Sequence, residues 1–133
     1  MALLYAREGA DVAVVHLPEE RVDAEQVRQE VEEQGRRCLL LPGDLKDTEF
    51  CRETVERTAD RLGGLSILVS NAAHLNSKLE REQLTADDFD RTFKTNIYAY
   101  FLVMAALPHL DPGDAVIATT TEEALKGSTT MID

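Results

Sequence analysis

The sequence predicts an α/β fold in which a parallel β-sheet carries helices on both of its faces. Short apolar runs rich in valine and leucine alternate along the chain with longer segments whose apolar residues recur at helical spacing. Alternation of this kind is typical of parallel strands that are joined by crossover helices. The 133 residues suit one modest domain.

Four short apolar runs are predicted to be strands. Their apolar residues follow one another without alternation, which is typical of strands covered on both faces. Pro42 and Gly43 end the second run, because proline and glycine interrupt regular pairing. The predicted strands comprise residues 11–16, 38–41, 65–69 and 115–119.

The segments between these strands are predicted to be helices. Residues 23–36 place Ala24, Val27 and Val31 on one helical face. Asp47 is expected to cap a second helix, which ends at the glycine pair of residues 63–64. The apolar stripe of this second helix comprises Cys51, Val55, Ala59 and Leu62.

Two further helical segments are expected. Thr85 and Asp88 resemble a capping box, and one long helix is predicted to run from there to about Leu107. Pro108 prevents its further extension. Residues 2–9 resemble the last two turns of a helix that has Gly9 at its C-cap.

Composition narrows the class of protein. The net charge of -11 argues against nucleic-acid binding, which requires a basic surface. No apolar run approaches the roughly 20 residues of a membrane helix, and the N-terminus does not resemble a secretory signal. We therefore expect a cytoplasmic protein in which Cys38 and Cys51 are reduced. The three histidines are scattered along the chain, so no metal site is expected.

Polar or small residues follow three of the predicted strands. Open α/β sheets bind ligands at the carboxyl ends of their strands, so these residues are candidates for a binding site. Each also has a structural interpretation: a turn cap for the aspartate, a tie between loops for the asparagine, and ordinary strand residues for the threonines. The candidates are Asp44 and Leu45, then Asn71, Ala72 and Ala73, and finally residues 119–121.

Asn96 is a further candidate because of its position on the long predicted helix. It lies on or beside an apolar stripe, and a buried amide without partners costs about 1–3 kcal/mol. Asn96 is therefore either a satisfied core amide or a group that holds an ordered water beside an active site, through its amide or its backbone carbonyl. The stripe comprises Phe89, Phe93, Ile97, Tyr100 and Met104.

Several of these segments together resemble a known family. ALLYAREGADVAVV, LPGDLKD, LSILVSNAAH, FKTNIYAYF and AVIATTTEE are similar to successive landmarks of the classical short-chain dehydrogenase/reductases. The turn at residues 17–20 resembles the branch of NAD(P)-dependent aldehyde, ketone and polyol reductases. The resemblance implies that residues 1–133 form part of a Rossmann-type, doubly wound parallel sheet, comprising strands 2 to 5 of the family. Because the family's strand order is 3-2-1-4-5-6-7, these four strands would form two pairs with open edges facing a gap.

The resemblance also implies roles for the candidate residues. Asp44 matches the aspartate that accepts a hydrogen bond from the adenine amino group, and Leu45 flanks the ring. Asn71, Ala72 and Ala73 match the stretch that passes the nicotinamide ribose, although the family usually has glycine where this chain has Ala73. Asn96 matches the helix asparagine that holds a water in the proton relay. Thr121 falls at the position of the active-site serine, counting back from the catalytic tyrosine expected directly after Asp133.

The activity implied is hydride transfer between nicotinamide and a small carbonyl or alcohol substrate, catalysed by a homo-oligomeric NAD(P)-dependent enzyme. His16 and Leu17 stand where NAD-preferring members often have an acidic residue, which slightly favours NADP. The family's glycine-rich turn and Tyr-x-x-x-Lys motif are absent from these 133 residues. We therefore expect a fragment truncated at both ends and inactive by itself.

Two alternatives to a piece of an active enzyme remain open. The first is a non-catalytic remnant or partner subunit that retains a nucleotide-binding edge; Ala73 and Thr121 favour it mildly, since both depart from the family pattern. The second is a phospho-acceptor signalling domain of similar α/β layout. That domain would require an aspartate at the end of the central strand and a lysine after a later strand, and the sequence offers neither arrangement.

Overall fold

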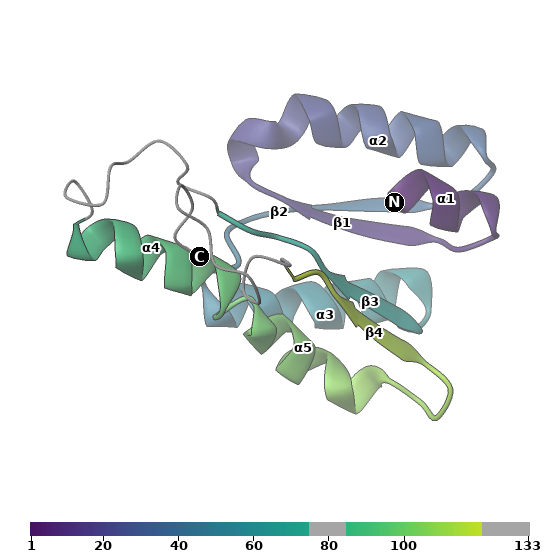
Figure 1. Cartoon of the computed structure of the whole chain (residues 1–133). Coiled ribbons are helices and arrows are strands. Elements are labelled where there is room, and N and C mark those ends of the chain that lie inside the picture. Colours follow the sequence, from purple (N-terminus) through teal and green to yellow (C-terminus); the bar gives the residue numbers. More distant parts are fainter. Residues whose placement is uncertain (75–84, 121–133) are drawn as a thin grey trace.

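Four strands in two parallel pairs form the centre of the molecule. The computed structural model describes residues 1–74 and 85–120. Strand β1 (Val12–His16) pairs with β2 (Cys38–Pro42), and β3 (Ile67–Ser70) pairs with β4 (Ala115–Ala118). All four strands run in one direction, with their carboxyl ends at the left of Figure 1. The predicted α/β fold and its division into two strand pairs are both confirmed.

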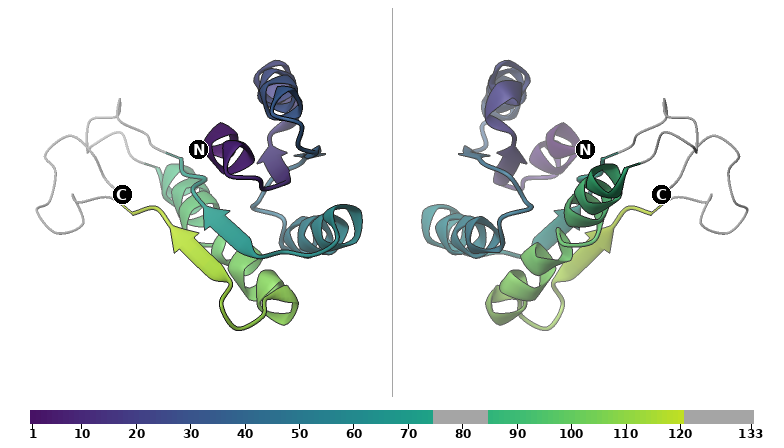
Figure 2. Two further views of the ribbon diagram at one scale, coloured as in Figure 1. Left: turned by 90° about the vertical axis from the view of Figure 1, so that its right-hand side faces the viewer. Right: turned by 90° about the vertical axis from the view of Figure 1, so that its left-hand side faces the viewer.

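Helices cover the strands from both sides. Helices α1 and α2 lie on one side of the strands, and α3 and α5 lie on the other (Figure 2). The helical elements are α1 (Ala2–Arg7), η1 (Pro18–Glu20), α2 (Arg21–Glu33), α3 (Thr48–Leu62), α4 (Ala86–Asn96), α5 (Tyr100–Ala106) and η3 (Leu107–His109). Among the described residues, no helix is long and apolar enough to cross a membrane.

The helix starts follow the predicted capping residues. The Asp47 carboxylate accepts hydrogen bonds from the backbone N–H groups of Glu49, at 2.9 Å, and Phe50, at 3.3 Å. Thr85 and Asp88 form the predicted capping box at the start of α4. Gly63 ends α3 with a φ of 88°, a left-handed conformation that favours glycine.

The prediction of one long helix up to Leu107 was wrong, because a turn at residues 97–99 separates α4 from α5. The Tyr98 N–H reaches back to the Phe93 carbonyl at 3.2 Å, and the Tyr100 N–H donates to the Ile97 carbonyl at 3.0 Å. The interruption follows Asn96, a poor helix former whose side chain is anchored outside the helix.

The main core lies between α3, α5 and β3. Its buried members are Cys51, Val55, Leu68, Leu102 and Ala106. The apolar stripe predicted on the long helix does not join this core: Phe93 is 43% exposed and Met104 is 63% exposed. Strand β4 was predicted to be covered on both faces but is exposed along its length, because it is the edge of its pair and α5 packs mainly on β3.

Candidate functional site

The chain that leaves β3 is tied to β4 by a side-chain hydrogen bond. Residues 71–74 continue from the carboxyl end of β3. The Thr119 hydroxyl donates to the Asn71 side-chain oxygen at 2.7 Å, and the Thr119 backbone N–H donates to the Ser70 carbonyl at 3.0 Å. Asn71 therefore fixes the two strand ends relative to each other.

Asn96 holds the same segment from the side of α4. Its Oδ1 accepts from the His74 backbone N–H at 2.6 Å, and its Nδ2 donates to the His74 carbonyl at 3.1 Å. Both polar atoms of the amide are thus used by one backbone unit 22 positions away in the sequence. Of the two interpretations of Asn96, this geometry supports a satisfied amide and leaves its backbone carbonyl as the group that can hold a water.

Ala72 and Ala73 lie between these two anchors, and both are exposed. Because their side chains are single methyl groups, the backbone of this segment stays accessible to a ligand at the carboxyl edge. The extra methyl of Ala73, compared with glycine, narrows that access without closing it.

Asp44 follows β2 at the carboxyl edge of the other strand pair. Its Oδ1 accepts from the Lys46 backbone N–H at 2.9 Å, and its Oδ2 lies 3.0 Å from the Lys46 ammonium. Partial burial opposes ionisation, but the Lys46 N–H and ammonium outweigh it, so the pKa of the Asp44 carboxyl lies below its ordinary value. The side chain is 42% exposed. An ionised carboxylate retains further acceptor positions, so Asp44 can still receive a hydrogen bond from a ligand.

Leu45 and Gly43 connect this edge to the helix that follows it. Leu45 is partly buried against the main core, and its carbonyl accepts from the Cys51 thiol at 3.4 Å. The Phe50 ring lies directly on Gly43, where an added Cβ would come within 2.3 Å of the ring. Sequence reasoning missed this contact, although an aromatic residue in the first turn after a Gly-Asp pair was a visible signal.

The structure therefore places six of the seven predicted site residues at one edge in two groups. Asp44 and Leu45 follow β2, whereas Asn71, Ala72, Ala73 and Asn96 surround the end of β3; Thr121 lies outside the described residues. Sequence analysis did not foresee the part played by His74. The Asn96 side-chain amide bonds to both the N–H and the carbonyl of the His74 backbone. A side-chain clamp on the backbone has no sequence signature of its own.

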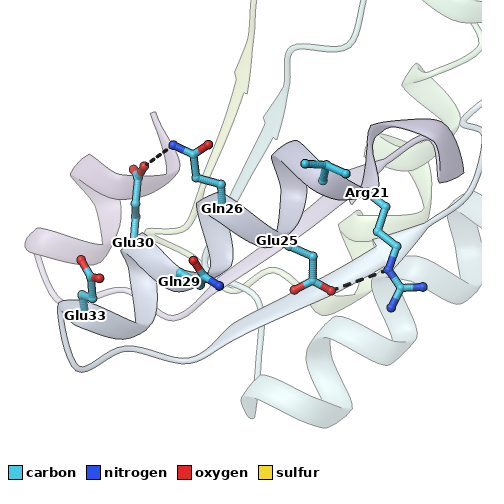
Figure 3. Close-up of a pocket in the computed structure, with 7 residues that line it drawn as sticks. Arg21, Glu25, Gln26, Gln29, Glu30 and Glu33 are labelled. Carbon is cyan, nitrogen blue, oxygen red and sulfur yellow. Dashed lines mark hydrogen bonds and ion pairs between the residues drawn. The ribbon is translucent and has the colours of Figure 1, made fainter.

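A hollow on the surface lies along helix α2. Figure 3 shows it along the outer face of α2, and its polar side chains come from that helix alone. Gln26 donates to Glu30 at 3.1 Å, and Arg21 lies 3.8 Å from Glu25. Because this hollow is open to solvent and four of its polar side chains engage one another in two pairs, it is not the candidate site. In the described part of the chain, no cluster of metal-binding side chains occurs.

Comparison with known proteins identifies the family. The family model described as "Enoyl-(Acyl carrier protein) reductase" matches residues 1–131. General stress protein 39 of Bacillus subtilis is 43% identical over 134 residues, which are 100% of this chain and 46% of that protein. The uncharacterized oxidoreductase YhxD of the same organism is 41% identical, over 99% of this chain and 44% of its own length. The chain spans about half the length of these relatives.

A solved structure shares both sequence and fold. The short-chain dehydrogenase of Burkholderia cenocepacia J2315, a complex with NADP, is 32% identical and superimposes with a TM-score of 0.91. The match covers 98% of this chain and 54% of that one. The agreement of motifs, fold and relatives shows that the chain belongs to the short-chain dehydrogenase/reductase family of oxidoreductases.

Proposed function

We propose that this chain forms part of the nucleotide and substrate site of an NAD(P)-dependent oxidoreductase, which transfers hydride between nicotinamide and a small carbonyl or alcohol. One observation carries the proposal. The carboxyl ends of β2 and β3 lie on the same edge and present an ionised carboxylate beside one strand and an exposed, anchored backbone segment beside the other. Parallel α/β sheets bind nucleotides at such an edge.

The adenine end of the cofactor is assigned to Asp44 and Leu45. The Asp44 carboxylate is ionised and half-exposed, so it suits an exocyclic amino group as hydrogen-bond donor. Leu45 supplies an apolar surface for the adenine ring, and its own packing against the core holds that surface in place.

The nicotinamide end is assigned to residues 71–73. Two methyl side chains let the cofactor's ribose approach the backbone, and the bonds from Thr119 and Asn96 hold that backbone in place. A cofactor bound there supplies the hydride. The protein's part is to hold the acceptor carbon near the ring and to deliver a proton.

Asn96 enters this scheme through its backbone. In an uninterrupted helix its carbonyl would accept from the Tyr100 N–H, but that N–H donates to Ile97 instead. We assign the carbonyl so released to the water of the proton relay, with the side chain as the anchor that holds it beside His74. The Thr121 hydroxyl is assigned to hydrogen-bond the substrate carbonyl.

NADP is the proposed cofactor in preference to NAD. The Glu20 carboxylate, which is close to the end of β1, accepts from the Leu17 N–H at 3.0 Å and so caps its own short turn. His16 and Leu17 themselves offer no carboxylate at the end of β1 for ribose hydroxyls, which NAD-preferring sites require. The Burkholderia cenocepacia relative is a complex with NADP.

The proposal includes a homo-oligomeric enzyme in the cytoplasm. Large apolar side chains are exposed on α4 and α5, which is typical of a surface that associates. Cys38 and Cys51 are free thiols, which suits a reducing compartment. Sedimentation of the purified protein tests the assembly, and a monomer at all concentrations would contradict it.

A titration of the isotopically labelled chain with NADP and NAD tests the cofactor assignment. We expect amide shifts at Asp44, Leu45 and residues 71–73, with tighter binding of NADP, and no turnover by the 133 residues alone. Shifts confined to other surfaces, or none with either nucleotide, would overturn the assignment. Asp44→Asn is the variant to compare with the unmodified chain, because it preserves the shape of the side chain and removes its negative charge.

A further inference from the structure

We propose that Phe50 is a positioning residue of the adenine site. Its ring, which is seated on Gly43, fixes the turn that carries the Asp44 carboxylate and so aims that carboxylate at the amino group of the base. In this role Phe50 acts through Gly43 and need not touch the cofactor. The inference rests on the proposed function, because it deepens the assignment of Asp44 to the adenine end of the cofactor.

Phe50 links helix α3 directly to the end of strand β2. It belongs to the first turn of α3, which begins at the edge where β2 ends (Figure 1). Residues 43–47 form the turn between strand and helix, and Gly43 is its first residue. The Phe50 side chain is half-buried, and its ring lies on Gly43. The ring therefore bridges the two ends of this turn.

The hydrogen bonds inside the turn hold its shape but not its position. The Asp47 N–H donates to the Asp44 carbonyl at 3.0 Å, and the Lys46 N–H donates to the Asp44 Oδ1 at 2.9 Å. Because both bonds join residues of the turn itself, they move with the turn as one unit. The position of the Asp44 carboxylate relative to the sheet depends on contacts that reach beyond the turn.

Both neighbouring elements supply such contacts. The Gly43 N–H donates to the His16 carbonyl at 2.9 Å, which ties the start of the turn to β1. From α3, the Cys51 thiol donates to the Leu45 carbonyl at 3.4 Å, and a thiol is a weak donor. The Phe50 ring adds a firm apolar contact from the same helix. Gly43 is thus held by a hydrogen bond from one side and by an aromatic ring from the other.

The ring, and not the backbone, explains the glycine at position 43. The φ of Gly43 lies outside the left-handed region, so other residues could adopt the same conformation. A Cβ atom at this position would collide with the Phe50 ring. The ring occupies the space that a side chain would need, so the sizes of the two residues depend on each other.

Loss of the ring should therefore impair recognition of the base more than binding of the rest of the nucleotide. A hydrogen bond to a carboxylate is strong only when donor and acceptor are close and aligned. Phe50→Ala leaves Gly43 without its support from α3, so the turn can shift and carry the Asp44 carboxylate out of alignment.

Two nucleotides that differ in one group measure this effect on the 133-residue chain. AMP carries the exocyclic amino group of adenine and purine riboside 5′-monophosphate lacks it, so the ratio of their dissociation constants reports the bond to Asp44. The unmodified chain should prefer AMP by about tenfold, as expected for a hydrogen bond to an ionised group. Phe50→Ala should reduce this preference to about threefold or less, and Phe50→Leu should give an intermediate value.

The controls separate positioning from a general loss of stability. Val55→Ala removes buried apolar surface further along the same helix, so it should lower stability and keep the preference for AMP. Gly43→Ala should lower the preference, and Phe50→Leu should restore part of it in the double variant, because the smaller side chain makes room for the methyl group.

Hydrogen exchange at the Gly43 N–H gives a readout without ligand. It should quicken by about fivefold in Phe50→Ala, because the ring no longer holds Gly43 beside the His16 carbonyl. Unchanged exchange would overturn the role of Phe50, as would a preference for AMP that survives in Phe50→Ala or falls equally in Val55→Ala; the proposed function would still stand. No preference for AMP in the unmodified chain would instead overturn the adenine assignment, and the role of Phe50 with it.

Discussion

The substitution Asn96→Ala should cost the candidate site about 1.5 kcal/mol of stability, the balance of two lost hydrogen bonds and a gain in helix propensity. The substitution removes both hydrogen bonds to the His74 backbone. Each contributes about 0.5–1.5 kcal/mol, and the higher helix propensity of alanine returns about 0.5 kcal/mol. Asn96→Asp should cost less, because a carboxylate still accepts from the His74 N–H but cannot donate to its carbonyl.

Urea unfolding followed by circular dichroism measures this loss. A loss of about 1.5 kcal/mol should lower the midpoint by about 0.7 M, for a slope of about 2 kcal/mol per M of urea. Thr92→Ala is the control on the same helix, because the Thr92 side chain makes no hydrogen bond in the described structure. Hydrogen exchange at the His74 N–H should quicken in Asn96→Ala and change less in Asn96→Asp, which keeps the acceptor. An unchanged midpoint together with unchanged exchange at His74 would refute the reasoning.

Three further substitutions test the edge and its supports. Asp47→Ala should cost about 1 kcal/mol of unfolding free energy by removing the α3 N-cap, whereas Asp47→Ser should largely preserve it; equal losses in urea would contradict the capping role. Gly43→Ala should cost about 1–3 kcal/mol through the Phe50 ring, and Phe50→Leu should relieve part of that cost in the double variant; additive losses would contradict the contact. The Arg37 backbone N–H and guanidinium hold the pKa of Asp11 below its ordinary value, so its stabilisation is present above about pH 4 and is lost as the pH falls through the lowered pKa. Asp11→Asn should therefore lower stability at neutral pH and flatten the acid limb of the stability curve, and an unchanged acid limb would count against this.

Most of the fold could be predicted from local patterns, because the relevant signals are strong and short in range. Asp47, Gly63 and the Thr85–Asp88 pair mark helix ends through hydrogen bonds that span a few residues. Apolar runs then identify the strands, and the helical segments between them indicate that the strands are parallel. The division into two strand pairs followed from the family resemblance, since periodicity alone does not give spatial order.

The break after Asn96 could not be predicted in the same way. At the break, the Asn96 side chain is bonded to His74, which lies 22 residues earlier in the sequence, and a local pattern does not contain such a contact. The exposure of Phe89 and Met104 was missed for a related reason. A stripe at helical spacing indicates a surface that packs, but it does not say whether that surface packs within the chain.

The sequence supplied the candidate residues of the site, which stay a prediction, but it did not supply their connections. Asp44 and Asn71 were identified by their positions after strands, and the structure adds their partners, Lys46 and Thr119. Asn96 was identified as an unusual helix residue, and only the structure shows that its side chain is occupied. Partners distant in the sequence decide such details, so one sequence cannot supply them.

Grafting is the most direct test of the central claim that these residues form a working part of an NADP-dependent oxidoreductase. Residues 1–133 would replace the matching segment of the Burkholderia cenocepacia dehydrogenase, which forms a complex with NADP. Calorimetric titration of the graft should give NADP binding similar to that of the parent, weakened by Asp44→Asn and by Asn96→Ala. A graft that folds with parental stability and yet fails to bind NADP would contradict the account.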